Sequence, residues 1–477
     1  MTDIKTDYRI KIGRKVLIER LNSASDGSDA VVGQESDDTE LQNILKETRV
    51  RVGTMLKMDN VSFLIGAGAS YDAGGILMGR IPKDLEQGLI WEAVRNPVEN
   101  GYPEWFSLFY ETLLFLTDQE FDQEQLRNDE FFYHDLFKCE IEKNLEEYLS
   151  HLHTWLASMS GSVQSISLTK AGSPRTLEIG KTALQTLIKK VTHGLADLLD
   201  LPNSAKMASR GKNTKDPLIA HRKFIKKVLN RPLNLRRANL FTLNYDTLLE
   251  QGADAEGAVL VDGFVGNLRR VFRPESFNLD FYFPAQTTEG KVHRYDRALH
   301  LYKLHGSITW HKVAEGWENP YGLYSSYFQQ NSHEDDVLIY PTPLKYGQTL
   351  GLPYSELFRR FGNAVAQPQS VLFVAGYGFG DEHVNAIIRQ ALAIPSFTLI
   401  VVDPDPKSDF VTQLQDLEDE RIWLISGSEL GTFANFVNKL LPDLCEEEID
   451  SKVIRTVQAL SNSAKNNGSS GGCLDGK

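Results

Sequence analysis

Polar side chains that can transfer protons or hold a sugar follow two short apolar segments. The segment NLFTLNYD carries Thr242, Asn244 and Asp246, and LHLYKLHGS carries His305. A histidine titrates near neutral pH, so it can take a proton from a sugar hydroxyl or a water molecule. An asparagine can hold that water or a ribose, and a carboxylate can accept a hydrogen bond from a carboxamide. These residue types indicate acid–base chemistry on a sugar-containing ligand.

Glycine-rich turns follow two further apolar segments, VSFLIGAGASYDAGG and SVLFVAGYGFGDEHVN. The first predicts a strand, a tight turn and a helix, and its turn contains Gly66, Ala67, Gly68 and Ser70. Backbone N–H groups at such a helix start can bind a phosphate. Tyr71 stands where a dinucleotide fingerprint has its third glycine, so the usual Rossmann pattern fails.

Each of these features also has a purely structural interpretation. Glycines after a strand often serve a tight turn, a single histidine is more often a packing residue, and Asn-Tyr-Asp can cap a helix. Ligands of open α/β sheets, however, bind at the carboxyl ends of the strands, where these segments would meet. Taken together, a backbone that approaches a pyrophosphate, a histidine and an asparagine fit cleavage of a nicotinamide–ribose bond.

The elements that must position these residues are short strands alternating with helices. The strands are continuously apolar, as expected when both faces of a sheet are covered, and the alternation predicts a doubly wound, mostly parallel α/β sheet. Residues 84 to about 230 have mostly helical character and predict a large helical insertion. The predicted strands are 61–65, 239–245, 299–305, 337–341, 370–378 and 397–405, with helices at 355–367 and 381–393.

Low-complexity segments lie on both sides of these alternating strands and helices. Residues 1–44 predict a short basic arm and a flexible acidic linker, residues 45–450 a single catalytic domain with its insertion, and residues 451–477 a C-terminal helix and disordered tail. The net charge of −13 over 477 residues argues against broad nucleic-acid binding. The three cysteines lie far apart, so we expect neither a disulfide framework nor a cysteine zinc site, and no metal. The absence of a signal-like or long apolar run predicts a soluble cytoplasmic protein that does not enter a membrane.

Four motifs in order, GAGAS, TLNYD, KLHGS and GYGFGD, resemble the NAD-binding core of sirtuins. The resemblance covers roughly Leu56 to Pro406 and implies a Rossmann-like fold. It is closest to the prokaryotic sirtuin-like NAD hydrolases of antiphage defence. The segments LYKLHGSITW and GFGDEHVNAIIRQAL resemble the sirtuin-like subunit that pairs with a HerA-type hexameric ATPase.

The resemblance implies a role for each matching residue. Asn244 would hold the reacting ribose and its water, His305 would be the catalytic histidine, and Asp246 would contact the nicotinamide amide. Asp403 would contact the adenosine ribose. The remaining residues expected to bind NAD are Gly66, Ala67, Gly68 and Ser70 at the pyrophosphate, Gly376, Tyr377 and Gly378 on the adenosine side, and Thr242.

Departures from the deacylase pattern favour hydrolysis. Leu243 stands where protein deacylases have a glutamine, ILMGRIP replaces their PDFR segment, and no cysteine lies between Cys139 and Cys445 to form their zinc module. Water would then attack the ribose, so the chain is predicted to be an NAD⁺ glycohydrolase that gives nicotinamide and ADP-ribose. A protein deacylase and a noncatalytic NAD or ADP-ribose sensor are the alternatives, and retention of Asn244 and His305 argues against the sensor.

The resemblance also implies partners. These are a homo-oligomer of sirtuin-like subunits and a HerA-like hexameric ATPase, with NAD depletion killing or arresting an infected cell. Residues 206–237 hold eleven Lys or Arg and one acid. The structural interpretation of this basic segment is a solvated loop or contacts with an acidic neighbouring subunit. The functional interpretation is a docking surface for the ATPase or for nucleic acid.

Overall fold

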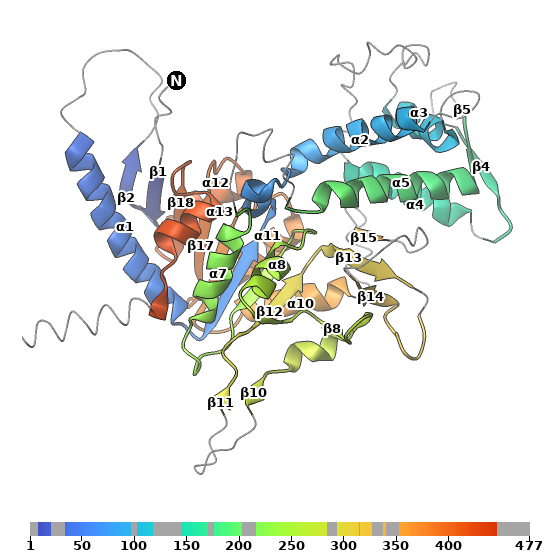
Figure 1. The fold of residues 1–477 in the computed structure, drawn as a ribbon. Helices are drawn as coiled ribbons and strands as arrows, with labels where there is room; N and C mark the ends of the chain where they lie inside the picture. Colours follow the sequence, from blue (N-terminus) through green and yellow to red (C-terminus); the bar gives the residue numbers. More distant parts are fainter. Residues whose placement is uncertain are drawn as a thin grey trace, which may run out of the picture.

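The main element of the chain is a nine-stranded sheet in the order β2-β1-β18-β17-β16-β3-β6-β12-β7 (Figure 1). The computed structural model describes residues 8–20, 34–96, 103–117, 145–159, 161–169, 176–202, 216–283, 293–313, 315–326, 337–339 and 353–445. Neighbouring strands are parallel except where β1 pairs with β2 and β18. The predicted doubly wound, mostly parallel α/β fold is therefore confirmed. The strands are β1 (Tyr8–Ile12), β2 (Lys15–Arg20), β3 (Asn60–Ile65), β6 (Asn239–Thr242), β7 (Val259–Val261), β12 (Ala298–Lys303), β16 (Ser370–Ala375), β17 (Thr398–Asp403) and β18 (Ile422–Ser426).

Helices cover both faces of this sheet because its central strands are apolar on both. Successive residues of β3 enter opposite cores: Phe63 packs with one set of helices and Leu64 with the other. Phe63 stacks on Phe373 of β16 and meets Phe224 edge-on, each at 5.0 Å between ring centroids. The first face carries α1 (Gln34–Leu56), α7 (Ile219–Leu229), α8 (Leu248–Ala255), α13 (Phe433–Asn435) and η7 (Phe436–Leu440), and the second α10 (Tyr354–Val365), α11 (Glu382–Leu392) and α12 (Asp409–Asp416).

The N-terminal segment differs from the predicted arm. Strands β1 and β2 form the edge of the main sheet, and α1 begins at Gln34, inside the predicted linker. Along β1, Tyr8, Ile10 and Ile12 are buried while the basic residues between them are half-exposed. This alternation lets one face of a short edge strand pack on the core, although the composition looks basic. Residues 21–33 and 446–477 lie outside the described part of the chain.

A second sheet combines strands from before and after the segment that contains His305. Its five strands are antiparallel, in the order β15-β13-β14-β9-β8. The predicted strand 337–341 was expected in the main sheet, but residues 337–339 pair with β13 here. The elements of this region are β8 (Phe264–Val265), β9 (Arg270–Phe272), η6 (Pro274–Asn278), β10 (Tyr282–Phe283), β11 (His293–Arg294), β13 (Gly306–Lys312), β14 (Leu323–Ser325) and β15 (Val337–Ile339).

The insertion extends away from the main sheet, at the upper right of Figure 1, and has an apolar core of its own. It contains a β-hairpin besides helices. Helix α7, at the end of the expected insertion, packs instead on the main sheet with α8 and η7. The elements are η1 (Ala67–Ala73) and η2 (Met78–Arg80), which lead into it, then α2 (Ile81–Arg95), α3 (Glu104–Thr117), α4 (Leu145–Ser158), β4 (Ser165–Thr169), β5 (Thr176–Gly180) and α5 (Lys181–Leu199).

The described cations of the basic segment bind groups of this chain. Arg222 pairs with Asp216 and Glu256, and Lys227 donates to the carbonyls of Val437 and Leu441. Further contacts of the same kind are Lys223 to Asn438, Arg231 to the carbonyls of Leu56, Met58 and Arg236, and Arg237 to Asp280. These contacts favour an intramolecular role over a docking surface. Residues 203–215 lie outside the described residues.

Candidate active site

A cavity of about 560 Å³ opens where β3, β6, β12, β16 and β17 end. The chain runs from β3 to β6 and β12 on one side and later to β16 and β17 on the other, so the cavity lies at the point where the strand order reverses. Open α/β sheets bind ligands at this point. The described residues that line the cavity are Gly66, Ala67, Gly68, Leu77, Leu243, Asn244, Tyr245, His305, Gly376, Tyr377, Gly378, Gly380, Asp381, Asp403 and Pro404.

Two glycine-rich loops contact each other through their backbones. The Gly68 amide donates to the Gly376 carbonyl at 2.8 Å, and a Cβ on Gly66 would lie 2.5 Å from that same oxygen. Gly376 has φ +67°, and a Cβ there would lie 2.4 Å from the Ala69 nitrogen. Gly378 differs, since a Cβ there would meet no heavy atom within 4 Å. Packing therefore requires glycine at 66 and 376, whereas Gly378 faces open space.

Asn244 lines this cavity and has one side-chain acceptor without a partner among the described residues. Its Nδ2 donates to the Gly66 carbonyl and to Ser70 Oγ, both at 3.0 Å. The Gly66 oxygen can only accept, so the amide group must face it and Oδ1 must face elsewhere. Oδ1 is buried without a hydrogen-bond partner among the described residues. A buried acceptor without a partner costs free energy, so a hydroxyl group or a water that reached this oxygen would gain a hydrogen bond.

Three residues predicted to bind the ligand instead support Asn244 and do not line the cavity. Ser70 donates to Asp246 Oδ2 at 2.6 Å, and Asp246 Oδ1 accepts from the Leu248 amide at 3.1 Å. Thr242 Oγ1 donates to the Ile65 carbonyl and accepts from the Asn244 amide, each at 3.0 Å. Ser70, Thr242 and Asp246 are buried and are absent from the described lining of the cavity. Their contacts hold Asn244 in place.

A partly buried ion pair lies under the same turn and was not anticipated from the sequence. Lys303 Nζ donates to the Asp246 carbonyl and lies 2.8 Å from a Glu250 carboxylate oxygen. Burial raises the pKa of Glu250, while the charge of Lys303 lowers it. The pattern KLH indicated only a strand end, because a lysine in an apolar strand does not reveal its partner. This pair fixes the backbone at Asp246.

His305 reaches the cavity from the end of β12 and pairs with a carboxylate. Its Nε2 lies 2.9 Å from Asp381 Oδ2, and both side chains are largely buried, at 12% and 9% exposure. The rings of Tyr245 and Phe358 lie 6.2 Å from the imidazole. Asp381 stood in the quoted motif GYGFGDEHVN but received no role from the sequence. The structure thus brings His305 and Asn244 to one cavity, as expected.

The residues predicted to bind adenosine also line the cavity. Tyr377, Gly376 and Gly378 line the cavity, and burial raises the pKa of Tyr377, so its hydroxyl stays neutral. Asp403 lies at the end of β17, where burial raises the pKa of its carboxyl group and Oδ1 accepts from the Asp405 amide at 3.0 Å. No lysine or arginine occurs among the described lining residues. A phosphate bound here would therefore rely on backbone N–H groups.

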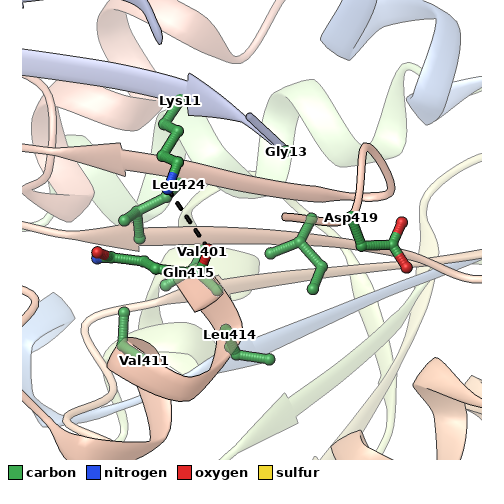
Figure 2. A pocket seen from close by; sticks show the side chains of 9 residues that line it. Lys11, Gly13, Val401, Val411, Leu414, Gln415, Asp419 and Leu424 are labelled. Carbon is green, nitrogen blue, oxygen red and sulfur yellow. Dashed lines mark hydrogen bonds between the residues drawn. The ribbon is translucent and has the colours of Figure 1, made fainter. Parts of the chain in front are cut away.

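A second hollow lies near the beginning of β18, between β1 and α12 (Figure 2). Its volume is about 10 Å³, which is room for one water molecule. Lys11 crosses it toward the Gln415 carbonyl, 3.5 Å away, and Asp419 pairs with Arg421. This hollow is too small to hold a nucleotide.

Within the described residues, no group of three or more His, Cys, Asp or Glu side chains is placed to hold a metal ion. No helix of the described part of the chain is long and apolar enough to cross a membrane.

Comparison with known proteins gives one family. The matched residues run from Ala238, before β6, to Ile425 in β18, and include Asn244, His305, Asp381 and Asp403. The loop at 66–70 lies outside the matched residues, and the fold brings it to the same cavity. The chain matches no curated protein. Residues 238–425 match the model of the SIR2-like domain, so this part of the chain is similar to the sirtuin-like family, and the match implies an NAD-binding site.

Proposed function

We propose that the chain is an NAD⁺ glycohydrolase, which converts NAD⁺ and water into nicotinamide and ADP-ribose. The observation that carries this proposal is that Asn244, whose Oδ1 has no partner among the described residues, and His305 line the same cavity. The volume of about 560 Å³ lies in the usual range for ligand pockets. The SIR2-like match supports NAD as the ligand.

In this proposal the side chains mainly orient the ribose and its attacking water. The bond between C1′ and the nicotinamide nitrogen breaks with its electron pair going to nicotinamide, and the water oxygen bonds to C1′. Asn244 Oδ1 accepts from the water or a ribose hydroxyl, and His305 takes the proton that the water loses. Gly66 and Gly68 let the 66–70 turn pack against the backbone of Gly376 at the edge of the cavity. Ser70, Thr242 and Asp246 keep the Asn244 carboxamide in its orientation.

The side chain at 243 supports hydrolysis over deacylation. Leu243 lines the cavity beside Asn244, so an apolar group occupies the position of the deacylase glutamine. No polar group at this position can help orient an acyl-lysine oxygen. Water is then the nucleophile that remains.

Nicotinamide release tests the proposal directly. The full chain is incubated with NAD⁺, with and without an acetylated peptide, and each arm is repeated with a HerA-like ATPase present. Peptide-independent release supports hydrolysis. Release that requires the peptide, together with loss of its acetyl group, identifies a deacylase. NAD⁺ binding without release in all arms identifies a sensor, and either of these two outcomes overturns the proposal.

Matched variants separate the site from the fold. Asn244→Ala removes the carboxamide, and Asn319→Ala removes one in a distant turn of the second sheet. We expect Asn244→Ala to lower turnover about 10²–10⁴-fold and Asn319→Ala to leave it unchanged. Circular dichroism and the melting temperature show whether each variant remains folded. A folded Asn244→Ala protein that releases nicotinamide at the parental rate contradicts the assignment.

The cellular role is part of the same proposal. The motif resemblance supports a defence effector that depletes NAD in infected cells, as a homo-oligomer bound to a HerA-like hexamer. Light scattering after size-exclusion chromatography, with and without that ATPase, measures both assemblies. A monomer that elutes apart from the ATPase at all concentrations rejects this part and leaves the chemistry standing.

A further inference from the structure

The loop after β16 holds a strained residue. Phe379 has φ +55°, a backbone conformation that bulky residues rarely adopt. Its ring stacks on Phe410 at 5.3 Å and lies 4.7 Å from the ring of Tyr377. Such strain persists only where the surrounding structure enforces it, and it occurs often at functional sites. The packing of Phe379 therefore fixes the path of the chain just before Asp381.

Hydrogen bonds close this loop around Asp381. The Asp381 amide donates to the Tyr377 hydroxyl at 3.0 Å, and that hydroxyl lies 3.1 Å from the Asp381 carbonyl and 3.2 Å from Asn385 Oδ1. Asn385 is fully buried, and its Nδ2 donates to the Phe379 carbonyl at 2.9 Å. The backbone of Asp381 is thus held on both sides.

The two carboxylate oxygens of Asp381 have different partners. Oδ1 accepts from the His383 amide at 2.9 Å and caps α11. Oδ2 lies 2.9 Å from His305 Nε2. An ionised carboxylate only accepts, so Nε2 must carry the proton in this contact. In a neutral imidazole, Nδ1 is then the basic nitrogen.

We propose that Asp381 is a positioning residue that selects the Nε2–H tautomer of His305 and leaves Nδ1 as the nitrogen that takes a proton. This inference rests on the proposed hydrolysis of NAD⁺. As the water oxygen bonds to C1′ and nicotinamide leaves with the electron pair, the water proton moves to Nδ1. The resulting imidazolium is stabilised by the Asp381 carboxylate and later loses its proton to solvent. Asp381 acts through His305 and need not touch the substrate.

Three variants of Asp381 separate this role from helix capping. Asp381→Asn and Asp381→Ser both cap a helix well, so α11 keeps its N-terminal contact. With its oxygen used at the cap, the asparagine turns its amide group toward Nε2 and favours the opposite tautomer. The serine does not reach His305. Asp381→Glu restores a carboxylate, and Asp254→Asn, an exposed acid-to-amide change on α8, is the matched control.

Steady-state kinetics with NAD⁺ give the first readout. We expect kcat to fall about 10²–10⁴-fold in Asp381→Asn, and by a similar factor in Asp381→Ser, with KM changed less than about threefold. Asp381→Glu should recover part of kcat, and Asp254→Asn should match the parent. A parental kcat in Asp381→Asn, or an equal loss in Asp381→Glu and Asp381→Ser, overturns the proposal.

The histidine tautomer gives a second readout that needs no activity. ¹⁵N-histidine NMR of the full chain identifies the His305 signals by their loss in His305→Ala. We expect the Nε2–H form in the parent and the Nδ1–H form in Asp381→Asn. An Nδ1–H parent refutes the proposal. If the parent shows the Nε2–H form but releases no nicotinamide under any condition, the proposed function fails and the His305–Asp381 pairing stands.

Discussion

Two hollows touch the same main sheet, and both contain charged or titratable side chains, but they differ in volume and in hydrogen bonding. The cavity at the carboxyl ends of the strands measures about 560 Å³ and is lined by Asn244, whose Oδ1 has no partner among the described residues. The hollow near the beginning of β18 measures about 10 Å³, and Lys11 and Asp419 there already bind groups of the chain (Figure 2). The volume and an unsatisfied hydrogen-bond acceptor therefore distinguish the two hollows better than the presence of charged side chains does.

The largest expected difference between the two hollows is catalytic. His305→Ala should lower nicotinamide release about 10²–10⁴-fold, because it removes the proposed proton acceptor. Lys11→Ala, in the small hollow, should leave turnover within about twofold. Nicotinamide release by liquid chromatography measures both, and equal effects of the two substitutions would erase the functional contrast.

The next effect concerns the backbone contact that shapes the large cavity. Gly376→Ala places a Cβ where backbone atoms lie within 2.4 Å, at φ +67°, and should lower stability by about 1–3 kcal/mol. Gly378→Ala meets nothing within 4 Å and should unfold like the parent. Urea denaturation of both variants tests this. A less stable Gly378→Ala than Gly376→Ala would contradict the packing account.

Larger side chains should have different effects in the two hollows. Gly378→Val adds methyl groups to the open space of the large cavity and should raise KM for NAD⁺ by roughly tenfold, about 1.4 kcal/mol of binding. Val411→Ile overfills the small hollow, so it should cost stability and leave KM unchanged. Parallel kinetic and melting measurements distinguish these outcomes. An unchanged KM in Gly378→Val would mean that the substrate does not approach this wall.

The smallest effect is a pH dependence that belongs to neither hollow. His221 is fully buried against Phe433, and burial lowers its pKa to about 4, despite the opposing charges of Asp246 and Asp72. The unfolded chain, with a pKa near 6.5, therefore binds this proton first as the pH falls. The contribution of neutral His221 to the free energy of unfolding is complete above about pH 6.5 and is lost toward pH 4. About 1 kcal/mol of it is lost between pH 6.5 and 5.5.

Urea denaturation across this pH range measures the slope. His221→Phe keeps an aromatic ring at this position but cannot titrate, so its stability should depend less on pH than that of the parent. His293→Ala, an exposed histidine on β11, is the control and should keep the parental slope. Identical slopes in the parent and His221→Phe would assign the acid sensitivity to other groups.

Local pattern allowed much of the fold to be predicted. The apolar runs that became β3, β6, β12, β16 and β17 were recognised because strands covered on both faces need apolar residues throughout. Strands β1 and β2 were missed because edge strands need only one buried face and can be basic on the other. The segment at 337–339 was assigned to the wrong sheet, since strand pattern carries no information about the pairing partner.

The amino-acid sequence by itself determined which polar residues follow the strands, and the rule for α/β sheets then brought Asn244 and His305 to one cavity. Only the tertiary structure decided which side chains face that cavity. Ser70 and Asp246 bind each other behind Asn244, and Asp381 pairs with a histidine 76 positions earlier in the chain. The physical reason is that hydrogen-bond partners are chosen by distance and direction in three dimensions, whereas a motif specifies only residue type and order.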